Sequence, residues 1–268
     1  MTENTFSFNF VEWFNNGFWG DKYIPHSLVD GEKVIANVSV SLMDFNMDGI
    51  DKSYIQIGTV MTDEKYRGQG LSRYLIEKII EEYKGKVDGI YLFANDSVID
   101  FYPKFAFIRG KEYQYSKMIN SINSKIQVEH IDMTNKMARH KFLDTVKNSV
   151  GNERLSMSNF GLMAFWTTGP MNDLIYYYAD ENAYIIADIE KENLYIYQVI
   201  SICKVNLEKV IKSFGSNIKK VRLGFTPYDV NGYDAVEFYK QNCTFFYLGK
   251  DLDKIEKKKL MFPILSHA

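Results

Sequence analysis

The sequence has few of the residues that hold disulfides or metals. Its two cysteines, Cys203 and Cys243, lie forty positions apart and form no CxxC arrangement. Its four histidines share no spacing typical of a zinc site. Two isolated thiols cannot build a disulfide framework, so we expect no metal site and a reducing compartment, the cytoplasm.

The sequence also lacks an excess of one charge and any long apolar run. Its 32 basic and 34 acidic residues give a formal net charge of −2, which produces no overall field to attract nucleic acid or anionic lipid. No stretch approaches the roughly 18 apolar residues of a membrane helix. Residues 1–16 carry no Lys or Arg and no small-residue cleavage site, unlike a signal peptide. We therefore expect neither nucleic acid nor a membrane as a partner.

The length of the chain predicts two domains. At roughly 100–200 residues per domain, 268 residues with 46% hydrophobic content suffice for two cores. Residues 119–129 are polar and lose the periodicity of their neighbours, as a linker does. We place the domains at residues 1–124 and 125–268.

Periodicity predicts the elements of the first half. Short β-rich runs separated by turn residues at 30–31 and 46–49 indicate an antiparallel meander over residues 23–62. Leu71, Leu75 and Ile79 follow helical spacing, which predicts an amphipathic helix to about residue 84. Residues 89–94 form a short apolar run typical of a buried strand, and a second helix is expected to start near residues 95–97.

The second half repeats this order of strands and helices. We expect helices over residues 133–150, 205–214 and 233–241, and strands near 183–189, 194–200, 220–225, 244–248 and 259–265. The two halves therefore look like one architecture used twice.

A glycine-bearing turn between a strand and the first helix is the most informative stretch. Gly68 and Gly70 have no Cβ, so the backbone can take positive φ, and the free N–H groups of a helix start favour an anion. The spacing does not match a nucleoside-triphosphate loop, and Arg73 stands where a dinucleotide fingerprint needs a third glycine. The two glycines alone do not decide between an anion site and a plain strand-to-helix turn.

Two motifs together resemble the GNAT N-acetyltransferases. Residues 67–72, Arg-Gly-Gln-Gly-Leu-Ser, resemble that family's acetyl-coenzyme A loop, pattern Q/R-x-x-G-x-G/A, with Ser72 in the last position. Residues 95–107 resemble its N-x-x-A-x-x-x-Y-x-x-x-G-F segment. Asn95, Tyr102 and Phe107 fall in register, and Val98 and Ala106 replace the usual Ala and Gly. The resemblance covers residues 25–118.

The resemblance implies an α/β (α+β) fold of two tandem acyl-CoA N-acyltransferase domains, each a mixed, mostly antiparallel sheet flanked by helices. It implies acetyl-CoA as co-substrate, with Tyr102 as the general acid that protonates the departing thiolate. Asn95 would orient the pantetheine amide. The residues implied to bind the co-substrate are Val60, Met61, Thr62, Arg67, Gly68, Gln69, Gly70, Leu71, Ser72 and Asn95.

Two departures bear on the chemistry. Pro103 disfavours a helical conformation at Tyr102, so the helix is expected to end or kink there and Tyr102 to point differently from the family's tyrosine. The strand over residues 54–59 carries no carboxylate to serve as general base. Asp44, Asp48 and Asp51 are candidates, as are a water chain and a residue of the second half.

The second half resembles the same segment without its loop. Residues 231–243 place Ala235, Phe238 and Tyr239 in register, but residues 203–209 contain no glycine. We interpret this half as a degenerate domain without co-substrate, in which Tyr239 is structural. Its aromatic residues either pack in a sheet or wall a substrate cleft: Phe165, Trp166, Tyr176, Tyr177, Tyr178, Tyr184, Tyr195 and Tyr197.

The sequence thus predicts an acetyl-CoA-dependent N-acetyltransferase that moves an acetyl group to a primary amine by direct attack. The acceptor is a small molecule or a peptide, and a homodimer is left open. The alternative is a non-catalytic acyl-CoA sensor or protein-interaction module, because no base is evident. A hydroxyl acceptor or another acyl donor is a third reading, since the loop recognises only the coenzyme A half.

Overall fold

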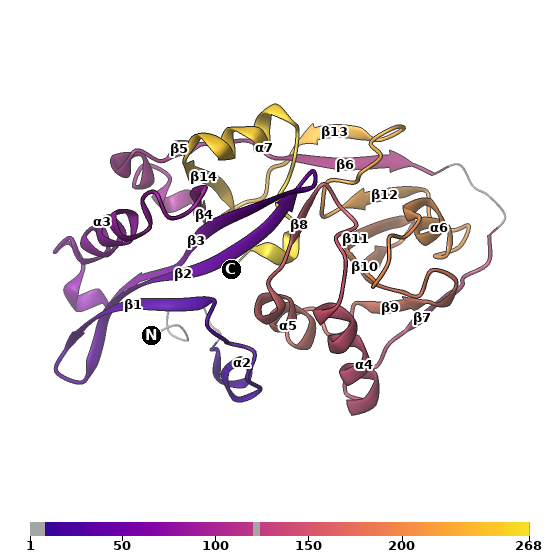
Figure 1. The fold of residues 1–268 in the computed structure, drawn as a ribbon, viewed down its shortest axis with the longest axis horizontal. Helices are drawn as coiled ribbons and strands as arrows, with labels where there is room; N and C mark the ends of the chain where they lie inside the picture. Colours follow the sequence, from indigo (N-terminus) through magenta and orange to yellow (C-terminus); the bar gives the residue numbers. More distant parts are fainter. Residues whose placement is uncertain (1–8, 120–123, 268) are drawn as a thin grey trace.

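The chain forms two mixed, mostly antiparallel sheets that lie side by side along the long axis of the molecule (Figure 1). The computed structural model describes residues 9–119 and 124–267. Within these residues no helix is long and apolar enough to cross a membrane. The predicted mixed α/β class with two sheets flanked by helices is confirmed.

The first sheet has the strand order β1-β2-β3-β4-β14-β5, with β8 paired to β2. Strands β1, β2 and β3 form the predicted antiparallel meander, while β3 and β4 run parallel because a helix connects them. The strands are β1 (Tyr23–Asp30), β2 (Lys33–Met47), β3 (Ile50–Thr62), β4 (Gly89–Ala94), β5 (Ile108–Arg109), β8 (Leu155–Met157) and β14 (Thr244–Leu248).

The second sheet has the order β13-β6-β12-β11-β10-β9-β7 and is antiparallel except for the pair β11 and β12. The predicted strands at 183–189, 194–200 and 220–225 are present as β10, β11 and β12. The strands are β6 (Tyr113–Met118), β7 (Val128–His130), β9 (Ile175–Tyr178), β10 (Ala183–Glu190), β11 (Asn193–Ile200), β12 (Lys220–Leu223) and β13 (Asp234–Glu237).

Helices pack against both sheets. The predicted helix α3 packs Leu75, Ile76 and Ile79 on one face of the first sheet. Helix α5 lies between the sheets, since Leu162 belongs to the core of the first and Met163 to that of the second. The helices are α2 (Val11–Asn15), α3 (Leu71–Tyr83), α4 (Lys136–Lys147), α5 (Phe160–Thr168), α6 (Leu207–Lys212) and α7 (Asp253–Lys257). Short 3₁₀ turns are η1 (Glu64–Tyr66), η2 (Asp96–Val98), η3 (Tyr102–Phe105), η4 (Ala179–Glu181), η5 (Lys250–Leu252) and η6 (Ile264–Ser266).

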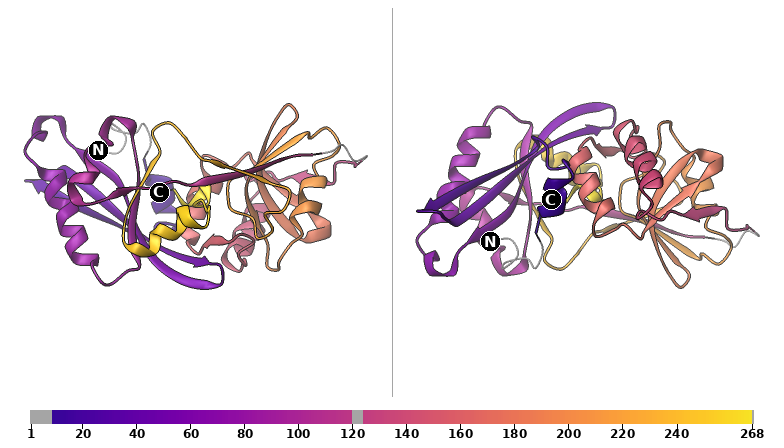
Figure 2. Two further views of the ribbon diagram at one scale, coloured as in Figure 1. Left: turned by 90° about the horizontal axis from the view of Figure 1, so that it is seen from above. Right: turned by 90° about the horizontal axis from the view of Figure 1, so that it is seen from below.

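The two halves of the chain exchange strands. β14, from the second half, lies between β4 and β5 in the first sheet, and β6, from the first half, lies between β13 and β12 in the second. Figure 2 shows the segment of β5 and β6 crossing from one sheet to the other. The sheets therefore do not follow the predicted division after residue 124, although residues 120–123 of that boundary lie outside the described part.

Three predicted elements differ from the structure in type or regularity. The helix expected over residues 233–241 is the edge strand β13, which pairs with β6, so tertiary pairing overrides the local pattern. The segment expected to form a strand over 259–265 is irregular, because its backbone forms hydrogen bonds with side chains. The N–H of Met261 donates to Thr226 Oγ1, and that of Phe262 donates to Glu112 Oε1. The helix expected from residues 95–97 is broken into the turns η2 and η3.

Candidate functional site

The glycine loop between β3 and α3 presents unbonded backbone N–H groups. Gly68 and Gly70 adopt φ of 79° and 78°, the left-handed region that glycine favours. The first helical N–H to find a backbone acceptor is that of Tyr74, which donates to Gly70 O at 3.0 Å. Among the described residues, the N–H groups of residues 68–73 donate no hydrogen bond. A row of free donors at the positive end of a helix is suited to hold a phosphate.

Side chains around the loop hold it to the end of β3. Ser72 Oγ lies 2.7 Å from Thr62 Oγ1, so the residue that departs from the loop pattern ties the helix start to the strand. Arg67 is exposed; its Nε donates to Thr62 O at 3.4 Å and its guanidinium lies 3.4 Å from Glu64. Arg67 thus lines the cavity next to the loop with an exposed side chain.

A slot opens where β3 and β4 separate. Their pairing ends at Gln56 and Tyr91, although both strands continue. Beyond that point β3 has a bulge at Thr59 and Val60, whose carbonyl at Thr59 accepts a hydrogen bond from the buried Asn37 side chain at 3.0 Å. From residue 57 onward, the edge of β3 facing β4 has no strand partner among the described residues. Such an edge can hydrogen-bond an extended, amide-bearing chain.

Tyr102 lies at this slot but on a 3₁₀ turn rather than an α-helix. It is 5% exposed and packs against the rings of Phe101, Phe107 and Phe246. Its hydroxyl makes no hydrogen bond within the described part of the chain. Burial raises the pKa of Tyr102 to about 12, so the phenol keeps its proton at neutral pH.

One cavity of about 1290 Å³ joins these features. Of the predicted binding residues, Val60, Arg67, Gly68, Ser72 and Asn95 line it together with Tyr102. The other five do not line it: Met61, Thr62, Gln69, Gly70 and Leu71. Thr62 instead supports the loop from outside, through its hydroxyl contact with Ser72.

A cluster of aromatic rings forms another part of the cavity lining. Five rings contact one another with centroids 4.7–5.9 Å apart. We call this cluster the aromatic wall; it consists of Phe10, Trp13, Trp19, Tyr23 and Phe165. The polar atoms of three members are bonded: Trp13 Nε1 to Gly161 O, Trp19 Nε1 to Tyr23 O, and Tyr23 Oη with Thr59 Oγ1.

Sequence reasoning missed most of this wall. Of the aromatic residues of the second half singled out in the sequence, Phe165 and Trp166 line the cavity. Phe10, Trp13, Trp19 and Tyr23 belong to no recognisable motif. The segment that holds them has no regular structure apart from the five-residue helix α2 and the start of β1. The six tyrosines listed with Phe165 and Trp166 do not line the cavity; two of them, Tyr178 and Tyr184, are buried in the second-sheet cores.

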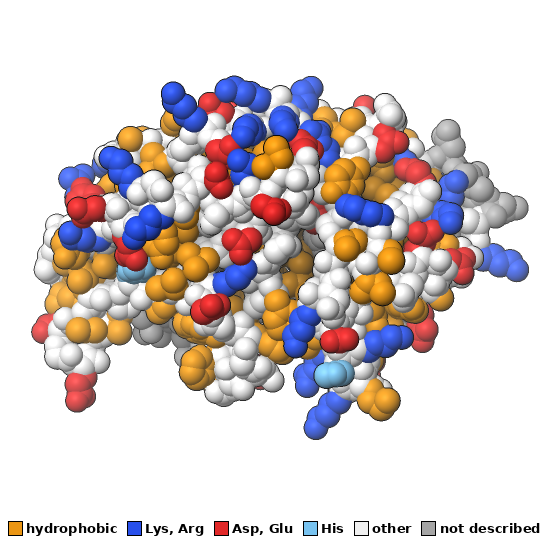
Figure 3. Space-filling view, in the orientation of Figure 1, with side chains coloured by type: hydrophobic (Ala, Val, Ile, Leu, Met, Phe, Trp, Pro, Cys, Tyr) orange, Lys and Arg blue, Asp and Glu red, His pale blue; other side chains and the backbone are white. Residues whose placement is uncertain are grey.

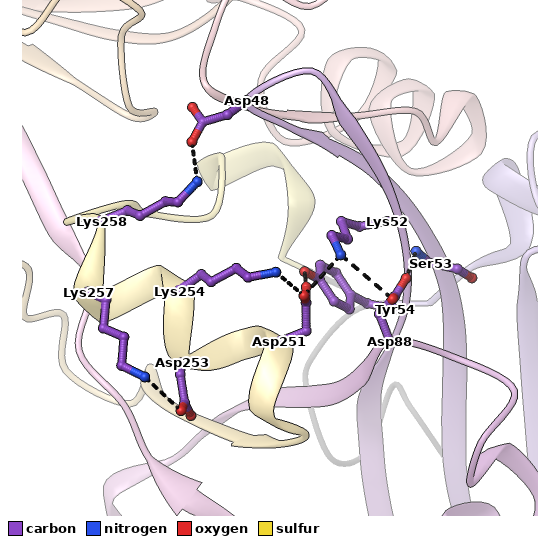
Figure 4. A network of polar contacts seen from close by, with 10 residues as sticks. All are labelled: Asp48, Lys52, Ser53, Tyr54, Asp88, Asp251, Asp253, Lys254, Lys257 and Lys258. Atoms are coloured by element: carbon purple, nitrogen blue, oxygen red, sulfur yellow. Dashed lines mark hydrogen bonds and ion pairs between the residues drawn. The ribbon is translucent and has the colours of Figure 1, made fainter.

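The three candidate carboxylates do not reach the cavity. Asp44 pairs with Lys22 at 2.7 Å, and Asp51 accepts a hydrogen bond from Asn46 at 2.8 Å. Asp48 binds Lys258 at 2.7 Å (Figure 4) and also Arg154, and these cations lower its pKa to about 2. The prediction that one of them reaches the site was wrong, because each carboxylate is held by a hydrogen bond or an ion pair outside the cavity. Among the described lining residues the only carboxylate belongs to Glu12, which is exposed.

His267 also lines the cavity. Its ring stacks on Phe93 with centroids 3.8 Å apart, and its Nδ1 lies 3.5 Å from Cys243 Sγ. Its Nε2 is buried without a hydrogen-bond partner in the described structure. Burial lowers the pKa of His267 to about 3, so the ring is neutral at pH 7.

The second half has no comparable loop in its described residues. The start of α6 is capped by the side chain of Asn206, which accepts from Lys209 N–H at 3.2 Å, so this helix start is already occupied. Tyr239 is 70% exposed and follows a strand instead of lying on a helix. The tyrosine-segment resemblance of this half is therefore not matched by its structure.

Charged side chains of both signs are interspersed on the face shown in Figure 3. No grouping of His, Cys, Asp and Glu in the described residues could hold a metal ion.

Comparison with known proteins agrees with this geometry. Residues 3–107 match the sequence model of the Acetyltransferase (GNAT) family. No curated protein matches the chain.

Among solved structures, a probable N-acyltransferase from Enterococcus faecalis V583 matches with a TM-score of 0.55 at 14% identity, over 91% of this chain and 66% of that one. A GCN5-related N-acetyltransferase from Kribbella flavida matches with 0.52 at 15%, over 88% and 61%. Eis1 from Mycobacterium abscessus matches with 0.53 at 10%, over 88% and 69%. At these identities the likeness concerns the fold, and the chain spans less than two thirds of the first two structures.

Proposed function

We propose that the protein is an acetyl-CoA-dependent N-acetyltransferase acting on a primary amine, and the match of residues 3–107 to the Acetyltransferase (GNAT) family model supports this. The observation that carries the proposal is a juxtaposition. The glycine loop, through Gly68 and Ser72, lines one cavity together with the unpaired edge of β3 and the protonated Tyr102. An enzyme needs these three parts to hold a coenzyme A thioester and to release its thiol.

Each part of the co-substrate has its own group of residues. The N–H groups of residues 68–72 hold the pyrophosphate, and Arg67 adds positive charge at the rim. The pantetheine amides bond the open edge of β3 around Val60, and Asn95 orients them from the end of β4. Open space where a Cβ would stand at Gly68 and Gly70 supports the fit of the co-substrate to the loop.

The transfer is a direct attack. The neutral amine nitrogen forms a bond to the thioester carbonyl carbon and the carbon–sulfur bond breaks. Tyr102 donates its proton to the departing sulfur, and the amine loses a proton to water in the cavity. Because the pKa of Tyr102, about 12, lies above that of a thiol, the phenol gives up its proton only while charge develops on the sulfur, and the proton lost by the amine then restores the phenol.

The second sheet and its helices are proposed to be a degenerate GNAT-like unit that binds no co-substrate; the unit is not residues 125–268 alone, because β14 belongs to the first sheet and β6 to the second. The capped start of α6 and the absence of glycine in residues 203–209 support this. Its contribution is to the cavity, through Phe165, Trp166 and His267. The two cysteines, which form no disulfide, support a cytoplasmic location.

Release of coenzyme A thiol from acetyl-CoA in the presence of amines tests the proposal, with Tyr102→Phe as the variant. The loss of one proton donor is expected to lower kcat by about 10²–10⁴, with the Kd for acetyl-CoA unchanged. Tyr239→Phe is the matched control, because it removes an exposed hydroxyl outside the cavity and should leave kcat unaltered. Tight binding of acetyl-CoA without turnover of any amine would instead establish the sensor alternative.

A further inference from the structure

The acceptor side of the cavity begins where the slot ends. Tyr23 Oη lies 2.8 Å from Thr59 Oγ1 at the bulge of β3, which fixes the aromatic wall to the rim of the slot. Across from it, Phe93 lies on β4 two residues past the last pair with β3 and carries the stacked His267 ring. Aromatic side chains thus line the cavity both next to β3 and on β4.

The volume leaves room for a second substrate. Small-molecule pockets usually enclose about 300–1,000 Å³, and this cavity encloses about 1290 Å³. The loop and slot make up one part of its lining, so the part lined by the aromatic wall is available to the acceptor.

The charges around the cavity disfavour a polycation. Four basic side chains line it, and Glu12 is the only acidic one among the described residues. Lys22 is paired with Asp44, but Arg139 and Lys240 form no ion pair with another described residue. A second ammonium group on the acceptor would meet unpaired positive charge and apolar rings, where an uncompensated charge is costly.

We propose that the acceptor is a monoamine with an aromatic or similarly bulky apolar body, of the arylalkylamine class, and that di- and polyamines are poor substrates. This inference rests on the proposed function and adds the substrate class of the same site. The rings supply apolar surface for the body of the acceptor, and a ring face can also accept one ammonium before it loses its proton.

Three amines separate the contributions of the ring and of the second charge: 2-phenylethylamine, butylamine and 1,4-diaminobutane. With the full chain and saturating acetyl-CoA, kcat/KM should fall in that order, by at least about tenfold from first to last, which corresponds to about 1.4 kcal/mol. Binding is read independently from the quenching of tryptophan fluorescence by each amine, since Trp13 and Trp19 belong to the wall.

Two variants and one control sharpen the test. Trp19→Leu should raise KM for 2-phenylethylamine by about tenfold or more and leave 1,4-diaminobutane little changed. Phe14→Leu is the matched control, because Phe14 lies on the same segment and touches Trp19 but does not line the cavity. Phe165→Glu places a carboxylate in the wall and should shift the preference toward 1,4-diaminobutane.

The outcomes distinguish the two proposals. Acetylation that favours 1,4-diaminobutane, or that Trp19→Leu leaves untouched, overturns the acceptor class while the acetyltransferase function stands. Quenching by 2-phenylethylamine without any thiol release supports the acceptor site and overturns catalysis. Neither quenching nor turnover with 2-phenylethylamine overturns the acceptor class.

Discussion

Replacing Glu112 by Gln should stabilise the protein increasingly as the pH rises. Glu112 lies in the segment that crosses from β5 to β6 and is 3% exposed. Its Oε1 accepts the N–H of Phe262 at 2.8 Å, and no cation pairs with it in the described residues. Burial raises its pKa from 4.5 to about 8, so the folded protein holds a proton that the unfolded chain has lost at neutral pH.

The sign and size of the effect follow from this gap. A carboxyl group whose pKa is raised by folding contributes full stability below its unfolded pKa and loses it as the pH rises through the folded pKa. At about 1.4 kcal/mol per pKa unit, the unfolding free energy should lose roughly 3 kcal/mol through this group between pH 5 and pH 8. Gln keeps the acceptor for Phe262 N–H and cannot ionise, so the variant escapes that loss.

Urea unfolding of both proteins at pH 5, 6, 7 and 8 measures the difference. The advantage of Glu112→Gln should grow by roughly 3 kcal/mol over that range, whereas Glu77→Gln, on the exposed side of α3, should give no such trend. A difference that does not change with pH would refute the reasoning, because it would mean that Glu112 is solvated or paired in the folded protein.

Three further substitutions test other parts of the structure. Ala106 holds φ of 65° after η3, so Ala106→Gly should raise the unfolding free energy by about 0.5–1 kcal/mol in thermal or urea unfolding; a loss would contradict the left-handed conformation. Asp48 pairs with Arg154 and Lys258, which lower its pKa to about 2. The Asp48→Asn variant should therefore lose about 1 kcal/mol of unfolding free energy at pH 7 and almost none at pH 2, where the wild-type carboxyl is losing its charge. An equal loss at both pH values would rule out the ion pairs as its source. Burial lowers the pKa of His267 to about 3, so the unfolded chain binds a proton near pH 6 that the folded protein does not. In urea unfolding, the unfolding free energy of the wild type should therefore fall by roughly 2 kcal/mol relative to His267→Phe between pH 7 and pH 5. An equal pH dependence of the two proteins would show that the imidazole is protonated in the folded state as readily as in the unfolded chain.

Much of the first sheet could be predicted from local patterns. The meander, α3 and β4 follow from alternation, helical spacing and turn residues that act over a few positions. The glycine loop was predictable for the same reason, since positive φ at Gly68 and Gly70 is a property of the local chain.

The strand exchange could not be predicted in this way. Whether Thr244–Leu248 pairs with β4 depends on a partner about 150 positions away, and nothing in its own composition specifies that partner. The buried run Leu260–Phe262 has the composition of a strand but is wedged between the sheets, where Thr226 and Glu112 side chains satisfy its backbone.

The acceptor side of the site was missed for a related reason. Trp13 and Phe165 come from distant parts of the chain and meet only through the tertiary structure, with ring centroids 5.7 Å apart. The carboxylates near the β2–β3 hairpin were judged by their position in sequence, while Asp48 is held by Arg154 and Lys258 from the other half.

Binding of acetyl-CoA to the glycine loop tests the central claim most directly. The melting temperature of the wild type is compared with that of Gly68→Trp, which fills the loop, and of Gly232→Trp, which replaces a glycine of similar φ outside the cavity. At about 100 times Kd the ligand should add roughly 2.7 kcal/mol of stability to the wild type and to Gly232→Trp, and none to Gly68→Trp. No shift at millimolar acetyl-CoA, or an equal shift in Gly68→Trp, would contradict the account and leave the loop as a turn.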